Sequence, residues 1–99
     1  MAKGYWICFY RSISNPDALA EYAKLAGPAI QGGGGKFLAR GVPSKTYEAG
    51  KDQRTVVIEF ESVEKAKDWE DSPEYDAIKP IRHSSAKSRV FIVEGAATQ

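Results

Sequence analysis

The sequence has little of what metal-binding, secreted or membrane proteins depend on. Its 99 residues include one cysteine, Cys8, and one histidine, His83, so an internal disulfide is excluded and no metal-ligand spacing exists. No apolar run approaches the roughly 18 residues of a membrane helix, and no basic segment followed by an apolar stretch suggests secretion. We therefore expect a cytoplasmic protein that has no membrane partner, no metal and no cofactor.

The charged residues also exclude a class of partner. The chain carries 14 Lys and Arg against 13 Asp and Glu, for a net charge of +1, and the two signs are interleaved. Since no basic patch stands out, we expect no nucleic-acid partner. With 42% hydrophobic and 27% charged residues, the composition is that of an ordinary globular protein, and the length predicts one domain over residues 1–99.

Apolar periodicity predicts an α+β fold. Alternating apolar residues predict four strands, and apolar residues at helical spacing predict two long helices between them. The strands are expected at 4–11, 36–40, 55–60 and 90–94, and the helices start near Asn15 and Ser62. The order strand, helix, strand, strand, helix, strand is typical of the ferredoxin-like βαββαβ plan, in which both helices cover one face of a four-stranded antiparallel sheet.

Helix caps and breakers refine these boundaries. Asn15-Pro16-Asp17, Ser62 and Ser72-Pro73 each place a capping side chain at a helix start, and the two prolines suit the first helical position. Gly27-Pro28 predicts a kink or an early end of the first long helix. Residues 42–52, with Pro43 near their start, predict a β-hairpin arm that contains a short strand and ends in a turn.

Four consecutive glycines, Gly32 to Gly35, allow two interpretations. A glycine-rich loop that binds phosphate runs from a strand into a helix, whereas this run follows a helix and precedes a strand. A helix stop and a turn with positive φ fit the order better. We find neither a P-loop nor a dinucleotide fingerprint elsewhere in the chain.

Both faces of the predicted sheet are apolar. In the first strand one face carries Tyr5, Ile7 and Phe9, and the other carries Trp6, Cys8 and Tyr10. Two helices cover only one face of the sheet. The uncovered face would be a larger exposed apolar surface than monomers usually have. We therefore expect a homodimer through the sheet faces, with any pocket between helices and sheet or between the two sheets.

Several segments resemble a known family of small bacterial proteins, over nearly the whole chain and in the expected order. They are residues 3–7, 26–29, 34–41, 57–60, 72–75, 79–82 and 93–95. Together they resemble the domain-of-unknown-function 1330 family, which implies the dimeric α+β barrel superfamily. Relatives in that superfamily include cofactor-free monooxygenases, haem enzymes and lactone isomerases, so the resemblance implies a fold and brings no reaction. The chain departs from the family at Leu19, often aromatic, and at Ser84, usually glycine.

Two charged residues lie inside apolar strands, Arg40 and Glu59. Simple alternation puts Arg40 on the same face as Leu38, opposite Phe37 and Ala39. If Arg40 and Glu59 share a face, they form a buried pair that orients a polar ligand. Alternatively, each occupies a solvent-facing position, or the two form a salt bridge at the dimer interface.

Arg82 and His83 lie in a segment, residues 82–85, that we expect to be a loop before the last strand. His83 has an unperturbed pKa near neutrality, which makes it a candidate general acid or base together with Glu59; the alternative is an exposed histidine. Arg82 either binds a carboxylate or phosphate through its planar fork or complements a helix C-terminus.

Three aromatic residues, Tyr22, Trp69 and Tyr75, are expected on helix faces that meet the sheet. One interpretation is that they pack in the core. The other is that they turn a hydroxyl or indole donor toward a pocket, which would make them candidate ligand-binding residues. Cys8 is expected to be a small buried hydrophobe rather than a nucleophile, because no basic partner is evident near it.

These residues support two functional hypotheses. The first is a homodimeric ligand-binding protein or cofactor-free enzyme, whose small polar organic molecule occupies a pocket lined by some of Arg40, Glu59, Arg82, His83 and the aromatic residues. The second is a non-catalytic structural or regulatory dimer module with a filled barrel. A cavity of roughly a few hundred Å³ with convergent polar groups favours the first. Arg40 and Glu59 paired across the interface favour the second.

Overall fold

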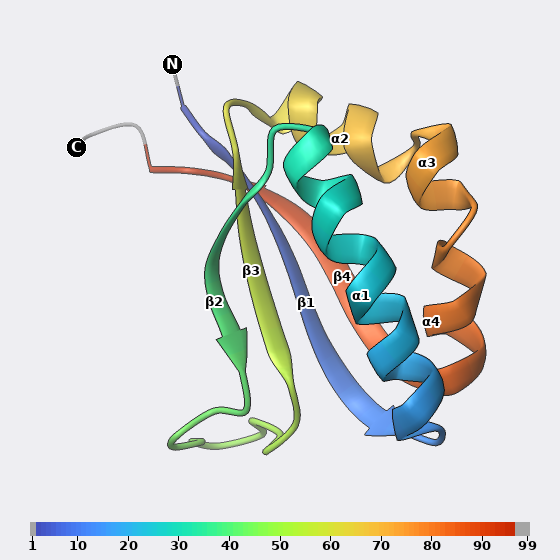
Figure 1. Cartoon of the computed structure of the whole chain (residues 1–99). Coiled ribbons are helices and arrows are strands. Elements are labelled where there is room, and N and C mark those ends of the chain that lie inside the picture. The colour runs from blue at the N-terminus through green and yellow to red at the C-terminus, as the bar shows by residue number, and fades with distance from the viewer. Residues whose placement is uncertain (1, 97–99) are drawn as a thin grey trace.

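The computed structural model describes residues 2–96. Its elements are β1 (Gly4–Ile13), α1 (Pro16–Gly32), β2 (Lys36–Gly41), β3 (Thr55–Phe60), α2 (Val63–Glu70), α3 (Pro73–Asp76), α4 (Lys79–Ser85) and β4 (Ala86–Glu94). The strands form one antiparallel sheet in the order β2-β3-β1-β4, and the helices lie on one face of it (Figure 1). This confirms the ferredoxin-like α+β fold.

The predicted helix starts are confirmed by their capping hydrogen bonds. The side chains of Asn15, Ser62 and Ser72 each accept a hydrogen bond from the backbone N–H three residues later, at 3.1, 3.1 and 3.3 Å. Each cap satisfies one of the backbone donors that have no partner inside the helix. Within residues 2–96, no helix combines the length and apolar character needed to cross a membrane.

The first long helix does not end at Gly27-Pro28, so the expected early end is wrong. Helix α1 continues through Pro28 to Gly32. Tertiary contacts outweigh the hydrogen bond that proline removes. Ile30 lies beyond the proline and is only 3% exposed, and the indole N–H of Trp69 donates to the carbonyl of Ala29 at 3.1 Å.

The segment between β2 and β3 is not the predicted hairpin arm. Residues 42–54 contain no strand and cross the end of the sheet as an extended loop (Figure 1). The backbone N–H of Gly50 donates to the carbonyl of Tyr47 at 2.8 Å, which closes a turn that includes Glu48 at a φ of 53°. Tyr47 is 73% exposed, so the β-forming residues here find no apolar surface to pack against.

The residues from Arg82 to Ser85 form the end of helix α4 rather than a loop, which corrects another expectation. Pro80 lies in the first turn, where its missing N–H has no intrahelical partner to lose. The hydroxyls of Ser84 and Ser85 donate to the carbonyl of Ile81 at 3.2 and 2.6 Å. These serines therefore bond back into the helix rather than interrupt it.

The pairing of β1 with β3 and β4 shows which side chains lie on each face of the sheet. On the helix side Trp6 is paired with Ile58 of β3 and Ile92 of β4. On the other side Tyr5 is paired with Glu59 and Val93. This outer face also carries Ile7, Phe9, Val57 and Phe91, and no helix covers it (Figure 1). The predicted alternation of β1, β3 and β4 is confirmed.

An irregularity in β2 reverses the predicted face of Arg40. The register of β2 against β3 shifts between Phe37 and Ala39, so that Leu38 has no partner. Phe37 is paired with Ile58, and Arg40 with Val56, both of which face the helices. A β-bulge inserts one unpaired residue and so changes the alternation beyond it. Arg40 therefore shares a face with Phe37 and not with Leu38.

The close approach of β1 to the turn before α2 predicts a strong effect of one substitution. A Cβ on Gly4 would lie 2.5 Å from the carbonyl oxygen of Ser62 and 2.6 Å from the backbone nitrogen of Val63. Because these are backbone atoms, Gly4→Ala is expected to lower the free energy of unfolding by about 1–3 kcal/mol in urea denaturation. The control Gly32→Ala, with nothing within 4 Å of its Cβ, should be neutral or stabilising by up to about 1 kcal/mol. Equal effects would contradict this packing.

Candidate functional site

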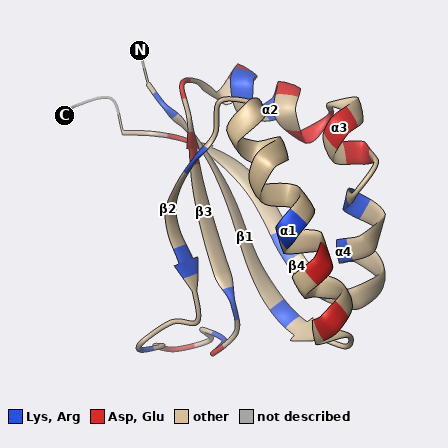
Figure 2. Cartoon of the chain, viewed as in Figure 1, with Lys and Arg blue, Asp and Glu red and all other residues tan. Residues whose placement is uncertain are grey.

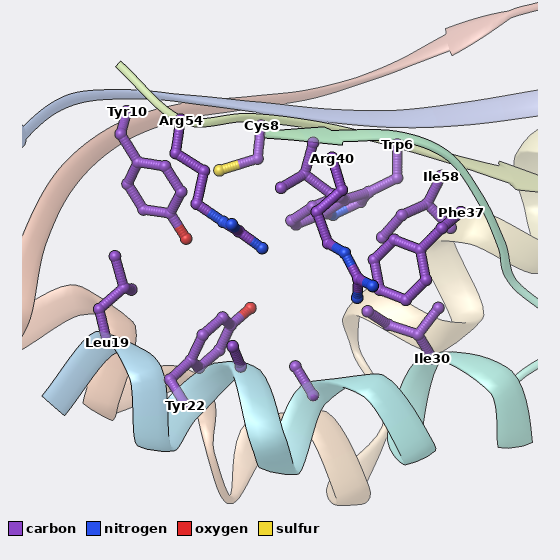
Figure 3. A pocket seen from close by; sticks show the side chains of 13 residues that line it. Trp6, Cys8, Tyr10, Leu19, Tyr22, Ile30, Phe37, Arg40, Arg54 and Ile58 are labelled. Carbon is purple, nitrogen blue, oxygen red and sulfur yellow. The ribbon is translucent and has the colours of Figure 1, made fainter. Parts of the chain in front are cut away.

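A recess, here called the α1 recess, lies between helix α1 and the sheet (Figure 3). Its water-accessible space is about 40 Å³, within about 420 Å³ of empty space that includes the open mouth. Aromatic and aliphatic side chains form most of its wall, and two arginines complete it. Its wall includes Trp6, Cys8, Tyr10, Tyr22, Phe37, Arg40 and Arg54.

Arg40 of β2 and Arg54, the residue just before β3, extend into the same recess (Figure 3). The Arg40 guanidinium lies 4.3 Å from the centre of the Phe37 ring, a cation–π contact that orients it. Neither arginine forms an ion pair or a side-chain hydrogen bond with any residue of the described 2–96. Two guanidinium groups thus face a mostly apolar space with their donors available.

The hydroxyls of Tyr10 and Tyr22 point into the recess from opposite sides, one from β1 and one from α1 (Figure 3). Both side chains are buried, and burial is the largest cause that raises the pKa of each phenol. The Tyr22 hydroxyl lies 2.5 Å from that of Tyr75, which is fully buried. Both recess phenols therefore stay protonated at neutral pH and act as neutral hydrogen-bonding groups.

Arg54, like Tyr10, is a recess residue that was not among the candidates from the sequence. It precedes β3, and its carbonyl accepts a hydrogen bond from the backbone N–H of Tyr10 at 3.0 Å, which holds it beside β1. The residue pair Gly41 and Thr55 brings the end of β2 beside the start of β3. The sequence could have indicated that Arg40 and Arg54 are neighbours if residues 36–41 had been paired with 55–60 as antiparallel strands. That pairing places Arg40 on the recess side only when the bulge at Leu38 is included.

A second concave region, here called the β4 groove, lies between helix α4 and strand β4. It has about 790 Å³ of water-accessible space open to solvent, and Arg82, His83 and Ser88 are among its walls. Arg82 is only 4% exposed; its Nη1 donates to Ser88 Oγ at 2.6 Å, and its Nη2 lies 3.3 Å from His83 Nε2. The Nε of Arg82 is buried without a hydrogen-bond partner in the described structure.

The candidate residues from the sequence therefore lie in separate places. Arg40 and Tyr22 line the α1 recess, whereas Arg82 and His83 line the β4 groove. Glu59 lies on the outer face, where it accepts a hydrogen bond from the Tyr5 hydroxyl at 3.2 Å. Because Arg40 lies on the helix side, it does not pair with Glu59.

Trp69 and Tyr75 lie in the core, stacked with ring centroids 4.1 Å apart. Cys8 is 1% exposed, and burial is the largest cause that raises the pKa of its thiol. It therefore lines the recess as a protonated thiol. Among residues 2–96, no three His, Cys, Asp or Glu side chains are grouped so that they could hold a metal ion.

A comparison with protein-family models shows to which family the chain belongs. The family model described as "Domain of unknown function (DUF1330)" matches residues 3–96. The chain belongs to this family. This confirms the resemblance seen in the sequence, and the DUF1330 description itself states no activity. None of the curated proteins matches the chain.

Solved structures of similar fold support the architecture. A protein of unknown function from Rhodopseudomonas palustris, RPA0582, matches with 18% identity and a TM-score of 0.73 over 96% of this chain and 83% of that chain. A dimeric ferredoxin-like protein of unknown function from Thermobifida fusca matches with 16% identity, a TM-score of 0.67 and coverage of 94% and 91%. SnoaB, a cofactor-independent oxygenase from Streptomyces nogalater, matches with 10% identity, a TM-score of 0.71 and coverage of 100% and 96%. At these identities the likeness shows the fold.

The buried phenols predict an alkaline limit to stability. The pKa values of Tyr10, Tyr22 and Tyr75 are raised in the folded state, with burial the largest cause for each. An unfolded tyrosine ionises near pH 10, so the folded state binds more protons above that pH and stability should fall as the pH rises through about 10. Phenolate absorbance at 295 nm should show these tyrosines titrating only together with unfolding.

Tyr22→Phe should remove a part of the absorbance change that coincides with the loss of circular dichroism. Reversible titration of all the phenols before unfolding would contradict the burial of this group.

Proposed function

We propose that the protein is a homodimer that binds a small organic acid in the α1 recess. The observation that supports this function most directly is the pair Arg40 and Arg54, whose guanidinium groups enter an aromatic-lined recess without an ion pair among residues 2–96. A carboxylate supplies the missing negative charge and accepts two parallel hydrogen bonds from a planar guanidinium.

The wall of the recess indicates an apolar body for this acid. Trp6, Phe37 and Ile58 present hydrophobic surface beside the arginines, and the Tyr10 and Tyr22 hydroxyls offer hydrogen bonds further inside. The free recess has about 40 Å³ of water-accessible space, enough for about three waters. The ligand would displace these waters and the flexible arginine side chains at the mouth. Its polar end then faces solvent and its apolar end faces α1.

Binding is a better proposal than a reaction for this recess. The groups able to exchange protons inside it are Cys8, Tyr10 and Tyr22, and the pKa of each is raised away from neutrality. SnoaB is described as a cofactor-independent oxygenase, which keeps cofactor-free catalysis compatible with the fold. The second candidate, a non-catalytic dimer module with a filled core, is supported by the small water-accessible volume of the recess.

The dimer part of the proposal follows from the outer face of the sheet. Tyr5, Ile7, Phe9 and Val57 are half-buried there without a covering helix, and Phe91 and Val93 are 41% and 45% exposed. Such a contiguous apolar face is stable in water when another sheet packs against it. The Thermobifida fusca protein of similar fold is described as dimeric, which supports the same arrangement.

The organic-acid proposal predicts a charge-dependent ligand interaction. In a thermal-shift and calorimetric screen with benzoate, phenylacetate and hexanoate, at least one acid should bind, and its neutral amide should bind at least tenfold more weakly. Arg40→Gln and Arg54→Gln should each lower the affinity about tenfold, or about 1.4 kcal/mol. Lys36→Gln is the control, because Lys36 lies on the same strand and is paired with Glu59 of the outer face. Equal loss in all three variants would contradict the site.

The dimer proposal predicts a mass of two subunits by light scattering at micromolar concentration. Val57→Lys places a charge in the middle of the outer face and should give monomers with retained circular dichroism. Leu25→Lys, on the exposed side of α1 at 48% exposure, should leave the dimer intact. A wild-type monomer at these concentrations would refute the dimer.

A further inference from the structure

The β4 groove contains a buried positive charge without a compensating negative one. Arg82 is 4% exposed, and no carboxylate forms an ion pair with it anywhere in residues 2–96. Buried arginines in folded proteins are ordinarily paired, because an isolated charge loses its hydration without a compensating interaction. Its hydrogen-bond partners Ser88 and His83, and the neighbouring Tyr75 hydroxyl, bring no negative charge.

The one acidic residue of the groove, Glu70, is already engaged. One of its carboxylate oxygens lies 2.5 Å from the Lys79 ammonium, and the other accepts a hydrogen bond from the Trp6 indole N–H at 2.7 Å. Lys79 also pairs with Asp76 at 3.2 Å. The charges of Glu70 and Lys79 therefore satisfy each other, and neither neutralises Arg82.

Two further cations line the same groove. Arg11 comes from the irregular part of β1 and Lys87 from β4, and both side chains are exposed. Like Arg82, they form no ion pair with the described residues. The groove thus gathers three uncompensated positive charges, one at its buried wall and two at its solvent side. This excess of like charge is unfavourable in the free protein and is relieved by a bound anion.

We propose that the β4 groove binds the phosphoryl group of a small molecule, with Arg82 at the inner wall and Arg11 and Lys87 at the rim. A phosphate monoester carries nearly two negative charges and three acceptor oxygens, which matches three cations better than a single carboxylate does. Arg82 presents its guanidinium donors, and Ser88 holds one of them in place at 2.6 Å.

His83 adds a further polar group to this site. A guanidinium only donates, so the Nε2 of His83 accepts from Arg82 at 3.3 Å and the ring proton resides on Nδ1. Partial burial and then the charges of Arg82 and Lys79 lower the pKa of His83, so the ring is neutral at pH 7. His83 therefore fixes the Arg82 side chain without adding a fourth positive charge.

This site is separate from the α1 recess. Arg40 and Arg54 line the recess and not the groove, and Trp6 is the one residue that lines both. The charge of Arg82 nevertheless lies near enough to Cys8, Tyr10 and Tyr22 of the recess to affect their pKa values, so the two sites are neighbours with different lining residues. Substitutions at the two sites distinguish them.

The test is a titration of ¹⁵N-labelled protein with inorganic phosphate, followed by amide chemical shifts at constant ionic strength and pH. Saturable shifts are expected in residues 79–88 and at Arg11, and acetate should bind at least tenfold more weakly. Arg11→Gln and Lys87→Gln should each weaken phosphate binding at least threefold, because both are exposed and their removal leaves the fold intact. Glycerol 3-phosphate should compete with inorganic phosphate.

A third variant examines the buried arginine itself. Arg82→Lys keeps the positive charge and removes the planar fork, and it should lower phosphate affinity at least tenfold with unchanged circular dichroism. The control variants are Arg40→Gln in the recess and Lys24→Gln on the exposed side of α1, and both should bind as the wild type does. Unsaturable shifts spread over many lysines, loss of binding in Arg40→Gln, or binding to phosphatidate vesicles without binding to glycerol 3-phosphate would overturn the proposal.

Discussion

The architecture depends on one aromatic cluster that joins the helices to the sheet. The Trp69 ring stacks on Tyr75 at 4.1 Å and meets Trp6 edge-on at 5.4 Å, and its indole N–H donates to the Ala29 carbonyl. Residues of α2, α3, β1 and α1 are thereby fixed at a single point. The α1 recess lies between α1 and strands β1, β2 and β3, and Trp6 of this cluster forms part of its wall.

The distribution of charge complements this packing. Figure 2 shows acidic residues on α1, α2 and α3, and basic positions on β2, β3 and β1 toward the end of the sheet that carries the 42–54 loop. Arg40, Arg54, Arg11 and Arg82 all remain without a carboxylate partner among residues 2–96. The net charge of +1 does not reveal these unpaired guanidinium groups, because it sums over all charged residues. These unpaired guanidinium groups are the basis of both proposals of anion binding.

Much of the fold was predictable because its signals are local. Alternation defined β3 at residues 55–60, and Asn15, Ser62 and Ser72 marked helix starts through their own side chains. The candidate site was predictable only in part, because its geometry depends on contacts between distant segments. Nothing in the sequence near Pro28 reveals Trp69, whose hydrogen bond helps the helix continue. Similarly, Arg54 becomes a site residue only through the pairing of β2 with β3.

The unpaired Leu38 has a consequence for how such a site can change. Strand side chains alternate between the two faces with a period of two. Whether the number of residues before Arg40 in β2 is odd or even therefore decides on which face its guanidinium lies. Removing one residue before Arg40 would turn the guanidinium toward the outer surface, with almost no change in composition or overall shape. The face on which Arg40 lies therefore depends on the number of residues before it as well as on residue type. Two chains with nearly identical side chains can consequently place this charge on opposite faces of the sheet.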